Sequence, residues 1–253
     1  MSRIAIVAAL EREIRPLVRE WRVSEKEYSG RRFRFFENGD VALVCGGIGA
    51  EAARRAAEAV IALYEPAVIY SAGFAGALDP GLKVGDVVQP LRVVNAGDGS
   101  SVSLDRGEGV LVSFGSVASA AQKARLGASF AAQAVDMEAA AVARAAEARG
   151  VEFAVVKVIS DEFDFTFPAL ERFVDAEGRF REGRFAWFTA VRPWLWPSVA
   201  RMAGNSRRAS QALCDFLGTI EQRNRVRSEG SSQAPASDPA PTEQRSTPMV
   251  NRR

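Results

Sequence analysis

The chain has 253 residues, of which 47% are hydrophobic and 25% charged, enough to bury the core of one α/β domain. Its 33 basic and 31 acidic residues nearly balance, and many of the basic ones lie toward the C-terminal end, so we expect no nucleic-acid partner. The sequence contains no histidine, which excludes histidine metal sites and histidine-activated serine or cysteine nucleophiles. The chemistry would therefore have to use carboxylates, lysine, backbone dipoles or a bound group.

Apolar runs alternate with helical patterns through the first half of the chain. The strand-like runs are Ile4–Ala9, Val41–Gly46, Ala67–Ala72, Val84–Val94 and Val110–Phe114, and the helical patterns are Glu11–Trp21 and Ala50–Tyr64. This alternation predicts a mixed α/β sheet with helices on its faces.

A second helix–strand unit follows in the middle of the chain. Asp136 is a candidate cap of an Ala-rich helix that runs to Arg149, with Gly150 just past its end. The next run, Phe153–Ser160, is apolar except for Lys157, as expected of a central strand covered on both faces. It leads to Asp161 at the carboxyl end of the strand, where open α/β sheets bind their ligands.

The C-terminal third is rich in aromatic residues. A loop carries Phe163, Phe165 and Phe167, and the segment Phe185–Leu217 carries Trp187, Trp194 and Trp196. Prolines interrupt this segment, so it cannot be an ordinary spanning helix. It is either a packed C-terminal helix or an amphipathic surface, with residues 185–200 as a peripheral membrane contact.

Composition predicts a single folded domain followed by a tail. From residue 221 the chain is dominated by Ser, Pro, Gln, Arg and Gly, which predicts a folded domain at 1–220 and a disordered tail at 221–253. The short, charged N-terminal run is not expected to be a signal peptide, and Cys45 and Cys214 are expected to be reduced core thiols. These features favour a cytoplasmic location.

Three carboxylates lie where a strand gives way to a loop or a helix. They are Glu13, Glu138 and Asp161. Each has a purely local explanation, because Glu13 and Glu138 could complement a helix dipole and Asp161 could cap a helix or an Asx-turn. Taken singly, none of the three identifies an active site.

Five stretches resemble one family in their order along the chain: Ile4–Glu13, Gly46–Ala50, Gly76–Asp86, Val135–Ala140 and Ile159–Asp161. They resemble the superfamily of nucleoside phosphorylases and methylthioadenosine/S-adenosylhomocysteine nucleosidases. The resemblance implies a three-layer α/β sandwich around a central mixed, mostly parallel sheet. It also implies an enzyme that cleaves the N-glycosidic bond of a purine, adenine-type nucleoside.

The resemblance also implies roles for individual residues. Asp161 would protonate the purine at N7, as a general acid must when the base departs, and Phe163 and Phe165 are candidates for its apolar surround. Glu138 would bind the ribose hydroxyls, with Met137 packed on the sugar. Glu13 would position or activate water.

Glycines and departures from the family pattern complete the candidate substrate site. Backbone amides at Gly47–Gly49 and Gly73–Gly76 would contact an anion or the substrate, although tight packing turns also explain such glycines. Phe74 replaces a serine that contacts the nucleophile or phosphate in many members. Lys157, close to the Ser160–Asp161 pair, replaces an arginine of the nucleosidases, which keeps the charge but loses the bidentate geometry, so the resemblance implies a weakened or altered oxyanion contact. The region 95–110 is shorter than in the nucleosidases, which leaves the group at the 5′ position open.

The C-terminal stretches 167–170, 175–179 and 192–193 are more similar to the shorter hopanoid-associated phosphorylases. That similarity favours phosphate as co-substrate and a hopanoid-linked nucleoside as substrate. Hydrolysis, as in the nucleosidases, is the alternative, and a catalytically silent nucleoside-binding protein is a further one. No cofactor or metal is expected, and the family implies a homo-oligomer, commonly a dimer.

Overall fold

The computed structural model describes residues 3–165, 170–173 and 181–232. Its helices are α1 (Glu11–Val18), α2 (Ala50–Tyr64), α3 (Ala120–Phe130), α4 (Ala139–Glu147), η1 (Leu170–Phe173), α5 (Glu182–Ala190), η2 (Pro193–Leu195) and α6 (Trp196–Ser232). Its strands are β1 (Ile4–Ala8), β2 (Arg22–Tyr28), β3 (Arg31–Asn38), β4 (Val41–Cys45), β5 (Val68–Ala77), β6 (Val87–Val88), β7 (Arg92–Asn95), β8 (Ser101–Ser103), β9 (Val110–Ser113), β10 (Ala134–Asp136) and β11 (Glu152–Asp161).

The strands form one mixed sheet. Their order is β2-β3-β4-β1-β5-β10-β9-β7-β8, and β11 pairs with β5 and β6. The central pairs β1–β4, β1–β5 and β5–β11 are parallel, so the carboxyl ends of β1, β5 and β11 lie at the same edge of the sheet. The outer pairs β2–β3, β3–β4 and β7–β8 are antiparallel.

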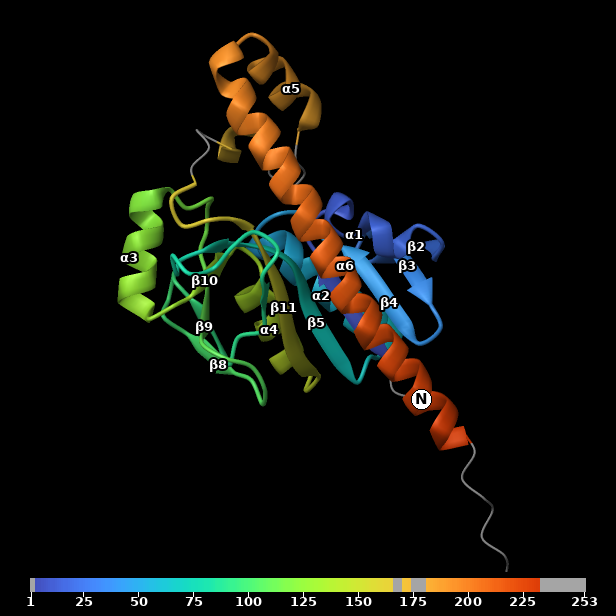
Figure 1. Cartoon of the computed structure of the whole chain (residues 1–253). Coiled ribbons are helices and arrows are strands. Elements are labelled where there is room, and N and C mark those ends of the chain that lie inside the picture. Colours follow the sequence, from blue (N-terminus) through green and yellow to red (C-terminus); the bar gives the residue numbers. More distant parts are fainter. Residues whose placement is uncertain (1–2, 166–169, 174–180, 233–253) are drawn as a thin grey trace, which may run out of the picture.

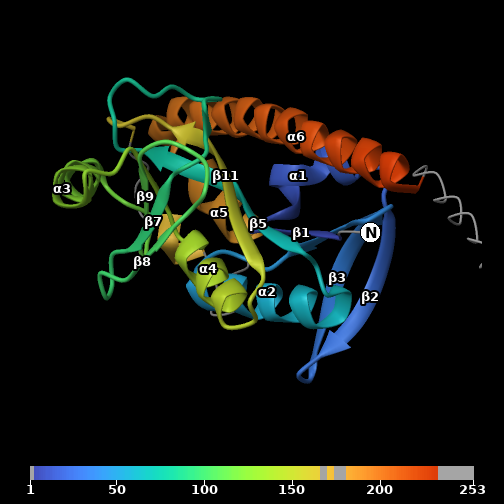
Figure 2. The ribbon, with the colours of Figure 1, turned by 90° about the horizontal axis from the view of Figure 1, so that it is seen from below.

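Helices cover both faces of the sheet, which confirms the predicted α/β sandwich. Helices α2 and α4 lie on one face and α1 and α6 on the other (Figure 2). The α2–α4 side buries small residues such as Ala56 and Val142 against Phe35, and the α1–α6 side buries Ile14, Leu213 and similar side chains. Alanine-rich helices can approach a sheet closely because their side chains are short.

The predicted elements agree with the structure at the core and differ at the edges. The helix Ala50–Tyr64 has the predicted bounds, whereas the run Val84–Val94 is divided into two short strands, β6 and β7. The hairpin β2–β3, helix α3 and the short strands β8 and β10 did not follow from the sequence pattern. Gly150 adopts a positive φ of 64° past the end of α4, as predicted for a helix terminus.

The C-terminal part differs most from its prediction. Helix α6 crosses one face of the molecule, and its N-terminal end projects from the body together with α5 (Figure 1). It continues to Ser232, past the boundary at residue 221, and Asn38 Nδ2 donates to Glu221 Oε1 at 2.7 Å. The division into a folded domain at 1–220 and a tail at 221–253 stays a prediction, with α6 helical across it. Phe167 and the stretch 175–179 lie outside the described residues.

Among the residues described, no helix combines the length and the apolar character needed to cross a membrane. Cys45 and Cys214 are both free thiols, and Cys214 is buried where α6 packs on α1.

Candidate active site

Glu13 is a buried carboxyl at the carboxyl-end edge of the sheet. It lies in α1, which follows β1 directly, and α6 closes over it, with Cys214 Sγ donating to the Glu13 carbonyl at 3.7 Å. Glu13 is only 5% exposed, and its Oε2 atom has no hydrogen-bond partner within the described part of the chain. Burial, followed by the charge of Glu138, raises the pKa of Glu13 from 4.5 to about 8.

Gly73 provides the space in front of this carboxyl. Its φ is +148°, and a Cβ built there would lie 2.9 Å from Glu13 Oε2 and 3.7 Å from Lys157 Nζ. A larger residue at this position would therefore collide with Glu13 and be strained in its backbone.

Glu138 is held by the glycine turn that precedes α2. Gly49 N–H donates to Glu138 Oε1 at 2.9 Å and Met137 N–H donates to Oε2 at 3.2 Å. Burial raises the pKa of Glu138, against the effect of Lys157, which favours the charged form. The amide predicted to contact an anion is thus occupied by the protein's own carboxylate.

Lys157 and Asp136 form a fully buried ion pair. Lys157 Nζ lies 2.9 Å from Asp136 Oδ2, and neither side chain is more than 1% exposed. Asp136 also accepts hydrogen bonds from Ser113 Oγ at 2.5 Å and from the N–H of Ala139, the first residue of α4, at 2.8 Å. Asp136 was predicted to cap this helix, but it ends β10 and the N-cap residue is Glu138. Burial acts to lower the pKa of Lys157, but the Asp136 and Glu138 carboxylates outweigh it and raise that pKa.

Asp161 is positioned by a bulge at the end of β11. Ile159 pairs with Ala75 and Asp161 with Gly76, so Ser160 is the extra residue. Ser160 Oγ donates to Asp161 Oδ1 at 2.9 Å. Lys123 Nζ forms a short ion pair with Asp161 Oδ2, a contact that the sequence did not predict.

The carboxylates therefore form two groups along β5. Glu13 lies against Gly73, whereas Asp161 Oδ2 would lie 2.8 Å from a Cβ on Gly76. Three steps along a strand at about 3.3 Å per residue separate these glycines by about 10 Å. Two groups of acids spaced in this way can contact the two ends of a small molecule.

Met137 and Phe74 were also predicted to contact the substrate. Met137 is half-buried beside Glu138. Phe74 is half-buried and packs against the apolar cluster on the α6 side of the sheet. Nothing in these contacts gives either residue a chemical role of its own.

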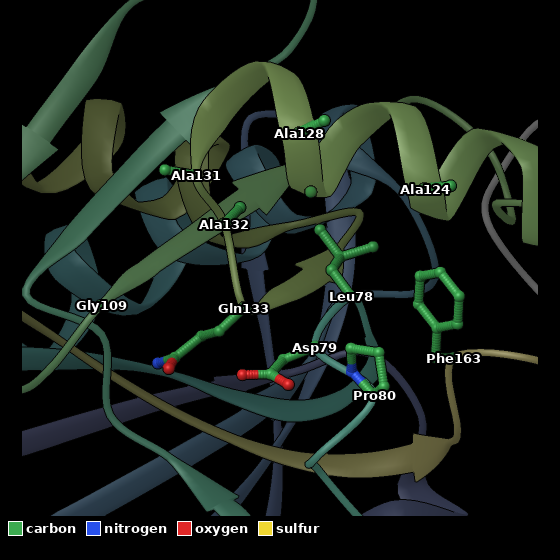
Figure 3. A pocket seen from close by; sticks show the side chains of 11 residues that line it. Leu78, Asp79, Pro80, Gly109, Ala124, Ala128, Ala131, Ala132, Gln133 and Phe163 are labelled. Carbon is green, nitrogen blue, oxygen red and sulfur yellow. The ribbon is translucent and has the colours of Figure 1, made fainter.

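A cavity of about 520 Å³ opens between α3 and the loop after β5. Leu78, Pro80 and Phe163 face the small residues of α3 across it (Figure 3). Phe163 is two residues past Asp161, and α3 also carries Lys123, so this cavity adjoins the acid at the Gly76 end of the site. Its wall is largely apolar, with Asp79 and Gln133 as its polar groups.

Within residues 3–165, 170–173 and 181–232, no His, Cys, Asp or Glu side chains gather in the way a metal ion needs. The groups described at this site are buried carboxyls and lysines. Such groups can donate or accept a proton and can stabilise a developing positive charge.

Comparison of the sequence with models of protein families identifies the family of this chain. The family model of the phosphorylase superfamily matches residues 3–115 and 107–182. The chain belongs to the phosphorylase superfamily. The five ordered stretches that carried the resemblance all lie within the matched residues. The hopanoid-associated subgroup is not resolved by this match.

A curated relative carries the name of a nucleosidase. The chain is 32% identical over 99 residues to the 5′-methylthioadenosine/S-adenosylhomocysteine nucleosidase of Marinomonas sp. (strain MWYL1). The match covers 38% of this chain and 42% of that relative. The chain thus matches less than half the length of this relative.

Solved structures of two other proteins share the fold. The futalosine hydrolase of Helicobacter pylori strain 26695 has a TM-score of 0.65 at 20% identity, covering 88% of this chain and 98% of that one. The 5′-methylthioadenosine/S-adenosylhomocysteine nucleosidase of Helicobacter pylori also has a TM-score of 0.65, at 19% identity, covering 88% and 99% of the two chains.

Proposed function

We propose that this chain hydrolyses the N-glycosidic bond of a purine nucleoside of the adenine type. The observation that carries the proposal is the buried Glu13 carboxyl, which has a pKa of about 8 and an oxygen without a hydrogen-bond partner among the described residues. A carboxyl with a raised pKa is, in its ionised form, a stronger base toward water than an ordinary carboxylate. The nucleosidase and hydrolase names of the relatives support the same reaction.

The two groups of acids would act on different parts of the substrate. Glu138, held by Gly49 and Met137, would bind the ribose hydroxyls and stabilise positive charge on the sugar as the bond breaks. Asp161, held by Ser160, would pass a proton to the departing base. Glu13 would take a proton from the water that attacks C1′.

Charge at the site favours water over phosphate as the nucleophile. Lys157, the cation predicted to contact an anion, is paired with Asp136 at 2.9 Å. The Gly49 amide donates to Glu138, and the Gly46 and Gly47 amides donate to carbonyls of residues 8 and 9. Lys157 and these three amides are therefore already paired within the protein and would not be available to bind a phosphate dianion near Glu13 and Glu138. The phosphorolysis favoured by the C-terminal resemblance therefore becomes the second candidate.

Product analysis separates the two candidates. Adenosine, methylthioadenosine and S-adenosylhomocysteine are incubated with the protein in buffers with and without phosphate, and free base and sugar products are quantified. Hydrolysis predicts equal rates in both buffers and a free sugar as the second product, which is ribose from adenosine, methylthioribose from methylthioadenosine and S-ribosylhomocysteine from S-adenosylhomocysteine. A requirement for phosphate together with formation of the corresponding sugar 1-phosphate would overturn hydrolysis.

Variants separate catalysis from binding alone. Glu13→Gln should lower the rate of base release by at least about 100-fold. Glu11→Gln is the matched control, because Glu11 lies in the same helix but is half-exposed and paired with Arg34 at 3.0 Å. Binding of a nucleoside without base release by the unmodified protein would instead identify a catalytically silent binding protein.

A lipid-linked nucleoside, such as a hopanoid-type one, is a candidate substrate because of the surface of α5, η2 and the start of α6. Trp187, Trp194 and Trp196 are 73%, 71% and 56% exposed there. The sequence from residue 183 to 214 contains five arginines and no acidic residue. Exposed tryptophans beside arginines match the interfacial zone of an anionic bilayer.

Vesicle sedimentation tests this second proposal. The protein should sediment with vesicles containing phosphatidylserine and less with neutral phosphatidylcholine vesicles. Replacing Trp187 and Trp194 by Ser should abolish sedimentation and leave hydrolysis of adenosine unchanged. Equal sedimentation of the double variant would reject these tryptophans as the membrane contact.

A further inference from the structure

Lys123 is a buried cation whose ammonium group contacts Asp161 and the backbone of Glu162, at the Gly76 end of the site. Its side chain is 1% exposed although it belongs to α3, a helix at the periphery of the molecule. Its Nζ donates to Asp161 Oδ2 and, at 2.7 Å, to the Glu162 carbonyl. We propose that Lys123 is a positioning residue that fixes the Asp161 carboxyl and supplies the proton that Asp161 passes to the departing base.

The fold holds Lys123 in this position from two sides. Ser119 and Gln122 form a capping box at the start of α3, and Lys123 N–H donates to the Ser119 carbonyl at 2.8 Å. Gly76 leaves room for the pair, because a Cβ there would lie 3.2 Å from Lys123 Cε and 2.8 Å from Asp161 Oδ2. A buried ammonium is costly unless it is paired, so these contacts need Asp161 as an anion.

An anionic Asp161 cannot protonate the base by itself. This inference rests on the proposed function, in which the purine leaves C1′ with the electron pair of the glycosidic bond. One N–H bond of the Lys123 ammonium breaks as an O–H bond forms on Asp161. That O–H bond then breaks as N7 of the base gains the proton.

The proton balance closes through solvent. Water attacks C1′ and releases one proton to Glu13, while the base takes one proton that originated on Lys123. Lys123 is then a neutral amine and Glu13 is protonated. Exchange with water returns both groups to their starting states, so no further reactant is required.

The two buried lysines therefore differ in what they do. Lys157 pairs with Asp136, which also accepts hydrogen bonds from Ser113 and Ala139, so this pair is fully enclosed. The carboxylate that pairs with Lys123 is 30% exposed in its side chain. Only the second pair can pass a proton to a bound molecule.

Leaving-group dependence tests the proposal. Lys123→Met is assayed on adenosine and on 4-nitrophenyl β-D-ribofuranoside, whose nitrophenolate departs without protonation. We expect kcat on adenosine to fall about 100-fold and kcat on the nitrophenyl riboside to fall less than about 3-fold. Lys123→Arg keeps the positive charge beside Asp161 but does not release a proton, so it should restore little of kcat on adenosine. Arg125→Met, which removes an exposed cation from the same helix, is the matched control.

A double-mutant cycle tests whether Lys123 acts through Asp161. In the Asp161→Asn background, Lys123→Met should cause no additional loss on adenosine. Equal losses on both substrates, or additive losses in the cycle, would overturn the inference. If Lys123→Met does not fold, Lys123→Gln is assayed with the same criteria. An unmodified protein that cleaves neither substrate would overturn the proposed function and this inference with it.

Discussion

The strongest quantitative prediction concerns the proton on Glu13. Its pKa of about 8 in the folded protein lies above the ordinary value of 4.5, so the folded state binds this proton more tightly than the unfolded chain. The contribution of Glu13 to the free energy of unfolding is therefore fully present below about pH 4.5. It decreases as the pH rises and is lost above about pH 8.

The size of the effect follows from the same two values. Each pH unit in which only the unfolded chain releases the proton costs about 1.4 kcal/mol. Between about pH 5.5 and about pH 8.5 the decrease due to Glu13 amounts to about 3 kcal/mol. Glu13→Gln has no proton to lose, so its free energy of unfolding should decrease by about 3 kcal/mol less than that of the unmodified protein over this interval.

Urea unfolding at a series of pH values measures this difference, since every other titrating group is common to both proteins. Glu11→Gln is again the control, because a half-exposed, salt-bridged surface carboxylate contributes about 0.5 kcal/mol or less. Parallel curves for the unmodified protein and Glu13→Gln would refute the reasoning. They would mean that Glu13 is already ionised in the folded protein at neutral pH.

Four further predictions rest on single contacts. The kcat/KM for base release should rise with pH and level off above about 8, because Glu13 must be ionised to accept a proton from water. A kcat/KM that does not change with pH below about 8 would contradict this. Gly73→Ala should lower stability by about 1–3 kcal/mol and reduce base release, since its Cβ would meet Glu13 Oε2 at 2.9 Å. Asp136→Asn should destabilise the fold by about 3–5 kcal/mol in urea unfolding because it leaves Lys157 buried without its anion, and adding Lys157→Met should recover part of that loss. Glu65→Gly should raise stability by about 0.5 kcal/mol in the same measurement, because Glu65 ends α2 with φ +47°.

The sequence predicts the centre of the fold well because the central strands are buried on both faces. β1, β4 and β11 are nearly continuous apolar runs, and such runs are diagnostic of parallel core strands. The hairpin β2–β3 was missed because its strands are rich in Arg and Glu, with one side exposed. The signal for it was the pair Ser29–Gly30, both of which have positive φ in the turn.

The candidate site was predicted as separate carboxylates and observed as two groups with their own cations. Glu13, Glu138 and Asp161 could be proposed because each lies where a strand gives way to a loop or a helix, within a stretch that resembles the family. Lys123 could not, because its partner is 38 residues away in sequence and the contact depends on how α3 packs. The same holds for Lys157, because its place in the family pattern implied an oxyanion contact but not that Asp136 supplies the anion.

The absence of histidine explains why burial is so prominent at this site. Histidine is the only side chain whose ordinary pKa allows proton transfer near neutral pH without a strongly perturbing environment. A chain without histidine must bring other groups into that range. Burial between α1 and α6 raises the pKa of Glu13 to about 8, slightly above neutral pH. Replacing Glu13 by His would introduce a base that is itself favoured in the neutral form by burial. If Glu13 serves as the base for water, Glu13→His should retain more base release than Glu13→Gln and shift the acid limb of the pH profile to lower pH. Equal activities of the two variants would show that the carboxyl at residue 13 contributes something other than proton transfer.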